Sequence, residues 1–529
     1  MKNRILLSNI VTILVILFLI TVKSASAQCL PEGITFSSQE QIDNFEIDYP
    51  SCTHILGDVL IEESISGNII NISGLSSIIE IDGNLGIGNN EALSNLAGLD
   101  NLTSIGEYFI IYSNTALSSL TGLESLTTIG QGFFITNSVV VDMSGLSSLT
   151  YIGGNLQVNI NPAFVNFSGF NNLVYLGGDL FVEENASLTS LNGLENLTSI
   201  GGDVWISENP ALSNFIGLDN LAVIEGDLDV GYNSSISSLI GLDNLTTIGG
   251  DMQVYYCDEL TSLNGLGNLA SIGRNVDVEE NALLTSLDGL NNLVSIAETF
   301  YIVHNINLVD LNSLSNLVSI GGGLEIINNF SISSLNGLDN ITSIGGDLSI
   351  INSAIGSLEG LNNISSIGGE LEIISNSHLT SLSGINNIDF SSITALHIRY
   401  CPMLSTCEVQ SICDYLGVTS NYASIESNAF GCDTRSQVEV ACATVDIKKY
   451  DSNDINIQFS PNPTSGIVHI DAYDIEGWQY SIWNAAGTMV ISNQLINNGQ
   501  IDITPLPSGL YFIKLKSIEE VFIKKIVKE

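Results

Sequence analysis

The chain has 529 residues and a formal net charge of −44 at pH 7, because 57 acidic residues outnumber 13 basic ones. Between Lys23 and Lys448 the only basic residues are Arg274, Arg399 and Arg435. A surface with this charge repels phosphate backbones and anionic headgroups, so nucleic-acid binding is excluded. The acidity favours solubility in salty surroundings, with recruitment of divalent cations as the alternative.

The first 27 residues predict a signal peptide. Lys2 and Arg4 precede an apolar run from Ile10 to Leu19, and residues 25–27 read Ala-Ser-Ala, an A-x-A cleavage site. We therefore expect the mature chain to start at Gln28, with an uncleaved membrane anchor as the alternative. No later segment is long and apolar enough to predict a membrane span in the mature chain.

Residues 28–56 predict an N-terminal cap. Cys29 and Cys52 flank this segment, which lies just before a long repetitive region. Cysteines in an exported chain form disulfides. We expect a Cys29–Cys52 bond to close this end of the repeats.

Residues 57–404 consist of about fourteen copies of a unit of about 24 residues, such as GGDLFVEENASLTSLNGLENLTSIG from Gly177 to Gly201. A fixed period of this length predicts a solenoid, in which each coil buries its apolar residues only against its neighbours. A solenoid presents a long regular surface rather than a single cleft. The repeat therefore favours binding over catalysis.

Each position of the repeat has a predicted role. The L-x-I stretch alternates buried and exposed residues, as a strand does. The Asn after it, as at Asn185 and Asn209, is expected to form a buried polar ladder, and Cys257 and Cys401 occupy the same position. Six coils separate these cysteines, about 29 Å at the usual strand spacing, so we expect two buried free thiols. The Asp of G-G-D and the Asn of G-L-x-N-L are expected to satisfy turn amides, with a calcium ladder along the Asp row as the alternative.

The unit G-L-x-N-L-x-S-I-G-G-x-L-x-I-x-x-N-x-x-L resembles the receptor L-domain type of leucine-rich repeat, which occurs in growth-factor receptor ectodomains and in bacterial surface proteins. The resemblance implies a mainly β fold, a right-handed solenoid of short parallel strands with three faces. The resemblance predicts the fold but almost nothing about the ligand, because a fold does not fix a function.

Residues 405–442 contain Cys407, Cys413, Cys432 and Cys442 and predict a C-terminal cap. Four cysteines allow three pairings, and the sequence alone does not choose among them. By analogy with cysteine-capped leucine-rich arrays, we expect the pairs Cys407–Cys432 and Cys413–Cys442.

A linker is expected at 443–454, and residues 455–529 lack the repeat. Short alternating segments separated by turns such as PNPTSG and LPSG predict a small β-sandwich. FSPNPTSG, NAAGTMV, LPSGLYFIKL and FIKKIVKE resemble the C-terminal sorting domain of the type IX secretion system. The residues that carry this resemblance are Pro461, Asn462, Pro463, Gly466, Gly509, Tyr511, Lys524 and Lys525.

The resemblance implies an export route. A protein of the Bacteroidota would cross the inner membrane by its signal peptide, be recognised in the periplasm by the secretion machinery, and then cross the outer membrane. In that family the domain is usually cleaved off, and the passenger is released or attached to the cell surface. The expected location is therefore extracellular or on the outer-membrane surface.

The exposed positions of the predicted strands supply the candidate binding residues, Phe181, Trp205, Tyr255, Tyr301, Asp229 and Asp277. Aromatic residues interleaved with acids on one face can bind a protein or stack on sugar rings, although aromatics also simply suit exposed strand positions. The histidines show no metal-binding spacing, and no catalytic motif, resident metal or cofactor is predicted. The expected function is secreted, non-catalytic binding or adhesion. A glycan-capturing protein for polysaccharide use and a hydrolase with an unrecognised site are the alternatives.

Overall fold

The computed structural model describes residues 27–445, 458–471, 478–496, 499–516 and 521–529. The expected signal peptide, apart from its last residue, and most of the expected linker lie outside these residues. The chain divides into two compact units, one of Met1–Gly321 with Asn328–Ser331, and the other of Gly322–Ile327 with Ile332–Glu529. Each unit is described by itself.

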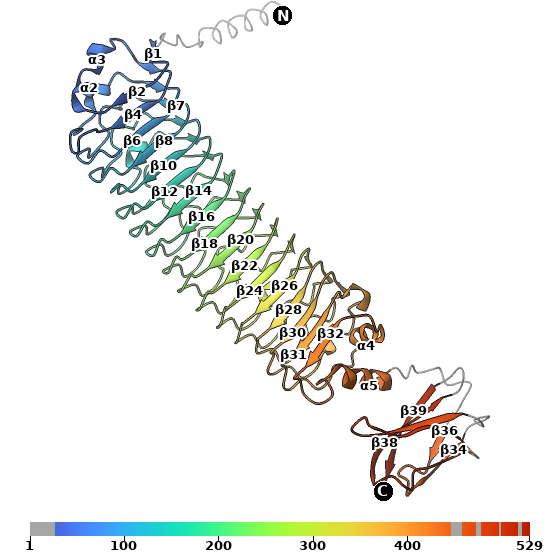
Figure 1. The fold of residues 1–529 in the computed structure, drawn as a ribbon. Coiled ribbons are helices and arrows are strands. Elements are labelled where there is room, and N and C mark those ends of the chain that lie inside the picture. The colour runs from blue at the N-terminus through green and yellow to red at the C-terminus, as the bar shows by residue number, and fades with distance from the viewer. Residues whose placement is uncertain (1–26, 446–457, 472–477, 497–498, 517–520) are drawn as a thin grey trace, which may run out of the picture. The chain divides into compact units, whose positions relative to one another are not determined.

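The first unit contains a ladder of long parallel strands, each paired in register with the strand one coil away (Figure 1). The first and third residues of each strand point into the core, as the L-x-I pattern predicts. The strands are β2 (Ile34–Phe36), β4 (Val59–Glu62), β6 (Leu85–Gly88), β8 (Phe109–Tyr112), β10 (Phe133–Thr136), β12 (Leu156–Asn159), β14 (Leu180–Glu183), β16 (Val204–Ser207), β18 (Leu228–Gly231), β20 (Met252–Tyr255), β22 (Val276–Glu279) and β24 (Phe300–Val303).

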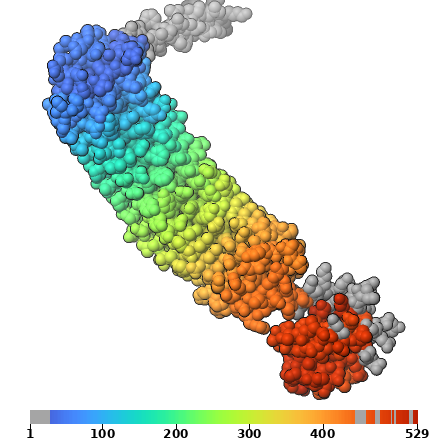
Figure 2. Space-filling model, in the orientation of Figure 1, coloured from blue at the N-terminus to red at the C-terminus, as the bar shows by residue number. Residues whose placement is uncertain are grey.

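A second ladder of two-residue strands forms another face of the same coils. It comprises β1 (Gln28–Cys29), β3 (His54–Ile55), β5 (Glu80–Ile81), β7 (Ser104–Ile105), β9 (Thr128–Ile129), β11 (Tyr151–Ile152), β13 (Tyr175–Leu176), β15 (Ser199–Ile200), β17 (Val223–Ile224), β19 (Thr247–Ile248), β21 (Ser271–Ile272), β23 (Ser295–Ile296) and β25 (Ser319–Ile320). Turns and the 3-10 helices η1 (Ser73–Leu75), η2 (Ser144–Leu146) and η3 (Asn312–Leu314) complete the coils. Figure 2 shows consecutive coils of this unit in close contact. The expected mainly β solenoid is confirmed.

The asparagine that follows most long strands forms the expected buried ladder, and Ser138 and Ser353 take this position in two coils. Asn185 donates from Nδ2 to the carbonyl oxygens of Val158 (2.8 Å) and Glu183 (3.0 Å), and its Oδ1 accepts from the backbone N–H of Asn161 at 3.2 Å. These bonds satisfy backbone groups inside the coil that water cannot reach. The ladder positions Cys257 and Cys401 are buried free thiols, as expected. Burial raises the pKa of the Cys257 thiol to about 12.

The other two polar rows are also structural. In the G-G-D row, Oδ1 of Asp203 accepts the backbone N–H of Asp227 at 2.8 Å, and the same contact recurs along the row. In the G-L-x-N-L row, Nδ2 of Asn220 donates to the Glu195 carbonyl at 2.8 Å. Both rows connect each coil to a neighbouring coil by side-chain-to-backbone hydrogen bonds.

The N-terminal segment closes the first unit. Helices α2 (Gln39–Asp43) and α3 (Phe45–Asp48) follow β2, and the ring of Phe45 packs edge-to-face on Phe36. The expected Cys29–Cys52 disulfide is present. Strands β1 and β2 pair with β3 and β4, so both ladders extend into this segment.

The second unit continues with the same kind of coil. Its long strands are β26 (Leu324–Ile327), β28 (Leu348–Ile351), β30 (Leu371–Ile374), β31 (Leu396–Arg399) and β32 (Ala423–Glu426), and its short ones are β27 (Ser343–Ile344) and β29 (Ser366–Ile367). The 3-10 helices are η4 (Ser383–Ile385) and η5 (Phe390–Ser392). Within the described part of the chain the solenoid has 17 long strands, more than the fourteen or so repeats expected, in part because β2 and β32 lie in the segments assigned to the caps.

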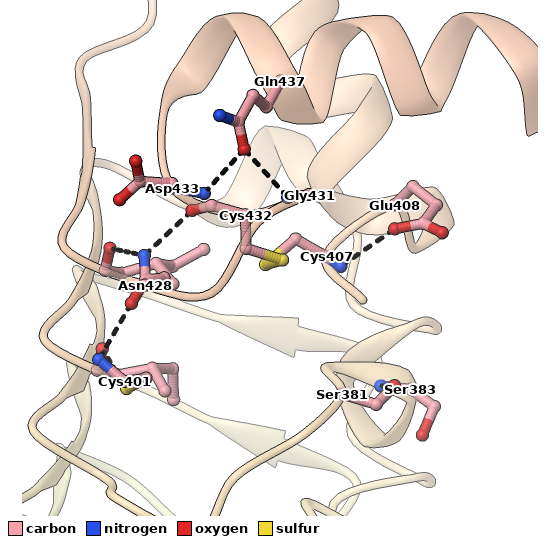
Figure 3. Close-up of a disulfide and its surroundings, with 12 residues drawn as sticks. Ser381, Ser383, Cys401, Cys407, Glu408, Asn428, Gly431, Cys432, Asp433 and Gln437 are labelled. Atoms are coloured by element: carbon pink, nitrogen blue, oxygen red, sulfur yellow. Dashed lines mark hydrogen bonds between the residues drawn. A yellow bond between two sulfur atoms is a disulfide. The ribbon is translucent and has the colours of Figure 1, made fainter. Parts of the chain in front are cut away.

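The segment after β31 forms the C-terminal cap with helices α4 (Gln410–Gly417) and α5 (Arg435–Val445). Both expected disulfides, Cys407–Cys432 and Cys413–Cys442, are present. Beside the first of them, Oδ1 of Asn428 accepts the backbone N–H of Cys401 at 2.9 Å, and its Nδ2 donates to the carbonyls of Ile398 and Cys432 (Figure 3). Asn428 thus takes the position of the asparagine ladder in the last coil.

Two antiparallel sheets form the C-terminal tail. The strands β33 (Gln458–Ser460), β34 (Ile467–Asp471) and β37 (Gln500–Asp502) make one sheet. The strands β36 (Met489–Leu495), β35 (Gln479–Asn484), β38 (Gly509–Lys516) and β39 (Val521–Lys528) make the other. Both sheets contribute to one apolar cluster that includes Val468, Ile501, Ile482 and Ile513. The tail is therefore a small sandwich, as expected.

Candidate binding face

The candidate binding residues share the outward side of the long-strand ladder in the first unit, here called the long-strand face. Phe181, Trp205, Asp229, Asp277 and Tyr301 are the second residues of β14, β16, β18, β22 and β24, and Tyr255 is the fourth residue of β20. The second residues lie in register and form one row, Phe181, Trp205, Asp229, Gln253, Asp277 and Tyr301. Neighbours in such a row are about 4.8 Å apart along the ladder.

The structure brings Phe181 and Trp205 together and keeps Tyr301 apart from them. The ring centroids of Phe181 and Trp205 are 6.5 Å apart, and Trp205 is 38% exposed. The indole Nε1 donates to Ser207 Oγ at 2.6 Å, which holds the ring along its own strand. Tyr301 lies four strands further along the row, beyond Asp277.

Asp229 and Tyr255 form the central contact of the face. The Tyr255 hydroxyl donates to the two carboxylate oxygens of Asp229 at 3.0 and 3.3 Å. The tyrosine ring passes over Gly231, where a Cβ atom would overlap it, so the glycine makes room for this contact. Burial raises the pKa of Asp229 to about 6 despite the hydrogen bond from Tyr255, and it raises the pKa of Tyr255 as well.

Asp277 presents an unused acceptor. Its Oδ1 atom is buried and has no hydrogen-bond partner among the described residues. Burial first, and then the charge of Glu279, raise the pKa of this carboxyl to about 6. A buried acceptor without a donor is costly, and a ligand that brings a hydrogen-bond donor would relieve that cost.

Tyr232 and Tyr256 belong to this site and were missed by the sequence analysis. Each precedes a ladder position and has a left-handed backbone, with φ of 53° and 50°. Their rings stack with centroids 4.9 Å apart and interplanar angle 11°, and Tyr255 packs edge-on against both. The signal was available, because aromatic residues occupy the position before the ladder residue in two consecutive repeats.

These residues combine exposed ring surfaces with carboxylate acceptors. Aromatic faces bind apolar ring surfaces and cations, and carboxylates accept hydrogen bonds from hydroxyl or amino groups. The long-strand face therefore has the chemistry of a recognition surface for a ligand that carries donors. It extends over several coils, from β14 to β24.

The tail residues that were singled out in the sequence come together at the terminal strand β39. Asn462 donates from Nδ2 to the Lys525 carbonyl at 2.9 Å, and its Oδ1 accepts the N–H of Val527 at 2.9 Å. It lies between two cis peptide bonds, at Pro461 and Pro463. These hydrogen bonds connect the segment 461–463 to two residues of β39 that lie more than sixty residues later in the chain.

The remaining tail residues have separate positions. A Cβ on Gly466 would come within 2.6 Å of Thr504 Oγ1, so a close approach of two segments requires a glycine there. Gly509 begins β38, and the Tyr511 hydroxyl donates to the Pro507 carbonyl at 2.7 Å. Lys524 and Lys525 are exposed, whereas Lys528, missed in the sequence, is buried and donates to the carbonyls of Thr504 and Leu506.

Residues 458–529 match the family model described as the secretion system C-terminal sorting domain. The tail is a type IX sorting domain. Its match begins with the first strand of the sandwich, β33, and includes every segment that carried the resemblance. No curated protein matches the chain.

The sorting domain implies interaction with the type IX secretion machinery and export to the cell surface or the extracellular space. Among the residues that the structure describes, no helix has the length and apolar character needed to cross a membrane. The sorting domain accounts for export, and the solenoid remains as the part whose activity needs an explanation.

Proposed function

We propose that the solenoid is a secreted, non-catalytic recognition or adhesion module that binds its ligand on the long-strand face. The observation that carries this proposal is the unpartnered Oδ1 of Asp277, which lies in register between Gln253 and Tyr301. A buried acceptor in a row that contains the exposed Trp205 and the half-buried Phe181 and Tyr301 is suited to a donor from a ligand.

The place of action follows from the sorting domain. We propose that the chain comes from a bacterium of the Bacteroidota and that a signal peptide takes it to the periplasm before the sorting domain is recognised. The passenger then acts outside the cell or on its surface. The three disulfides support this location, because such bonds persist in oxidising compartments.

The ligand is a protein or a glycan. A glycan is supported by the exposed indole of Trp205 and by the carboxylate of Asp277 and the amide of Gln253 in the same row. Sugars present apolar ring faces for stacking and hydroxyl donors for carboxylates. Capture of polysaccharide for use by the cell is therefore the second candidate function.

One observation favours a hydrolase, because both Asp229 and Asp277 have a pKa raised to about 6. Their strands, β18 and β22, have only β20 between them, so the two carboxylates are two strand spacings apart, about 10 Å along the ladder, near the carboxyl separation of inverting glycosidases. However, Asp229 is only 5% exposed and its oxygens accept from Tyr255, so it is poorly placed to reach a substrate. This supports the binding function over hydrolysis.

The experiment compares two double variants of the secreted chain on a glycan array and against surface proteins. Trp205→Ala with Tyr301→Ala removes rings from the long-strand face. Tyr151→Ala with Tyr175→Ala removes the stacked, exposed pair on the short-strand ladder, whose centroids are 4.8 Å apart. We expect loss of binding only in the first variant. Turnover of a glycan by the wild-type chain that disappears in Asp277→Asn would instead establish a hydrolase.

A further inference from the structure

Two clusters of two carboxylates and one histidine occur among the described residues. In each, one ligand atom per residue lies within 4.8 Å of the others. One cluster is Glu279, Glu280 and His304, and the other is Glu370, Glu372 and His397. The distances between the atoms within each cluster decide whether its residues hydrogen-bond to one another or are spaced to bind a metal ion.

The first cluster is satisfied by the protein itself. Nδ1 of His304 lies 2.7 Å from Glu280 Oε1, the distance of a direct hydrogen bond. The other ring nitrogen contacts Asn328 Nδ2, and the imidazole is 40% exposed. Both nitrogens of His304 therefore have partners, and an ion would have to displace one of them.

The second cluster leaves its histidine incompletely satisfied. The His397 side chain is 14% exposed, and its Nδ1 is buried without a hydrogen-bond partner among the described residues. The Tyr422 ring packs against the imidazole with centroids 5.5 Å apart. Nε2 is the nitrogen that faces Glu370, so it is the candidate ligand atom, and the unpaired Nδ1 leaves the ring without a second hydrogen bond that would fix its proton.

The carboxylates lie beside this ring on consecutive strands. Glu372 on β30 is in register with His397 on β31, and Glu372 Oε2 accepts from Ser349 Oγ at 2.9 Å. Glu370 immediately precedes β30, and its Oε2 lies 3.3 Å from His397 Nε2. The Ser349 contact orients one carboxylate, as a supporting hydrogen bond does for a metal ligand.

The 3.3 Å separation distinguishes the two clusters. Ligands bound at about 2.0–2.1 Å to a tetrahedral ion lie about 3.3–3.4 Å apart. The Glu370–His397 atoms have that separation, whereas the 2.7 Å between Glu280 and His304 is too short for it. An imidazole nitrogen with two carboxylate oxygens suits zinc or a similar transition metal rather than calcium, which takes oxygen ligands.

We propose that Glu370, Glu372 and His397 bind one zinc-type divalent ion, with the fourth position open to water. The ion would connect β30 to β31 next to the C-terminal cap, so that it stabilises that end of the solenoid. The strongly negative charge of the chain would raise the local concentration of cations around it.

The test titrates the full secreted chain with Zn²⁺ by calorimetry in excess Ca²⁺, which occupies weak sites on exposed carboxylates. We expect one Zn²⁺ per chain and a rise in the melting temperature. His397→Gln and Glu372→Gln should each weaken Zn²⁺ binding by more than about 10-fold, and His304→Gln, the matched control, should leave it unchanged.

Cobalt substitution gives a second measurement, because Co²⁺ bound to nitrogen and oxygen ligands absorbs in the visible and the spectrum reports its geometry. Loss of that spectrum in a folded His397→Gln chain supports the site. No zinc binding by the wild-type chain, equal binding by His397→Gln, or loss caused by His304→Gln alone would overturn the proposal. Displacement of zinc by the excess Ca²⁺ would overturn the choice of ion.

Discussion

The Tyr255 hydroxyl donates a 3.0 Å hydrogen bond to Asp229, which lies one strand earlier in the ladder. Asp229 is only 5% exposed, and Gly231 leaves the space through which the tyrosine ring reaches it. This contact holds a carboxylate within an aromatic surface, where water stabilises its charge poorly. The consequence is a pH dependence that can be measured.

Replacing Asp229 with Asn should flatten part of the dependence of stability on pH. The folded pKa of Asp229 is about 6, above the ordinary value near 3.8, so the folded state holds this proton more tightly than the unfolded state. Its contribution to stability is complete below about pH 4 and is lost as the pH rises through 6. When the pH is raised from 4 to 7, we expect the free energy of unfolding of wild type to fall further than that of Asp229→Asn. The difference between the two changes should be on the order of 1 kcal/mol.

Urea unfolding at both pH values measures this difference. Asp258→Asn is the matched control, because Asp258 is exposed. Equal changes with pH in wild type and Asp229→Asn would contradict the assigned shift in the pKa of Asp229.

Replacing Cys257 with Asn should stabilise the solenoid. The thiol occupies a ladder position, but its sulfur lies 3.8 Å from the Val230 oxygen and 3.6 Å from the Tyr255 oxygen. An amide would donate true hydrogen bonds to these carbonyls, as Asn281 does to Val254 at 2.8 Å. We expect a gain of about 1 kcal/mol in the free energy of unfolding, measured by urea denaturation.

Cys257→Ala provides the comparison for that variant, because it removes the thiol without supplying an amide. It should be less stable than wild type, owing to the lost packing and the unpaired carbonyls. A Cys257→Asn chain that is no more stable than Cys257→Ala would refute the hydrogen-bonded ladder as the reason for asparagine at this position.

Replacing Asn185 with Ala should be strongly destabilising. The substitution leaves buried backbone groups of Val158 and Asn161 without their partner. We expect a loss of about 2–4 kcal/mol in the free energy of unfolding. Asn196→Ala in the exposed G-L-x-N-L row also removes one contact, to the Asn171 carbonyl, and should cost less than about 1 kcal/mol. Similar losses in the two variants would show that burial of the ladder does not set the cost.

Deleting residues 455–529 should trap the passenger in the periplasm, because the segment that the secretion machinery recognises is then absent. Cell fractionation and surface labelling measure the outcome. As the converse experiment, residues 443–529 fused to an unrelated periplasmic reporter should take it to the surface or the medium. Normal display of the truncated chain would be incompatible with the sorting assignment.

The repeat allowed most of the fold to be predicted, because each coil follows local rules that the sequence states many times. The alternation in L-x-I placed Leu180 and Val182 inside, and the asparagine position identified Asn185 and the thiol of Cys257 as buried. The second-position row was predicted in register for the same reason. These features depend on a coil and its neighbours alone.

The contacts that define the binding face were not predicted in the same way. The Tyr255–Asp229 hydrogen bond depends on the absence of a side chain at Gly231. Gly231 stands at a variable position of the repeat, so the consensus sequence does not mark it as important. The stacking of Tyr232 on Tyr256 follows from a left-handed backbone at the position before the ladder residue, which recurs from coil to coil but is not visible in a consensus of apolar, Gly and Asn positions. The burial of Lys528 depends on carbonyls from a distant turn. The Tyr255–Asp229 bond and the burial of Lys528 arise from specific three-dimensional contacts that the repeat does not encode.

The most direct test of the account is the binding of the secreted chain to its glycan or protein ligand after removal of Trp205 and Tyr301. We expect Trp205→Ala with Tyr301→Ala to lower the affinity by about 10-fold or more, since large aromatic residues dominate such surfaces. Tyr151→Ala with Tyr175→Ala should retain wild-type affinity. Full affinity in the first variant, or its loss only in the second, would contradict binding on the long-strand face.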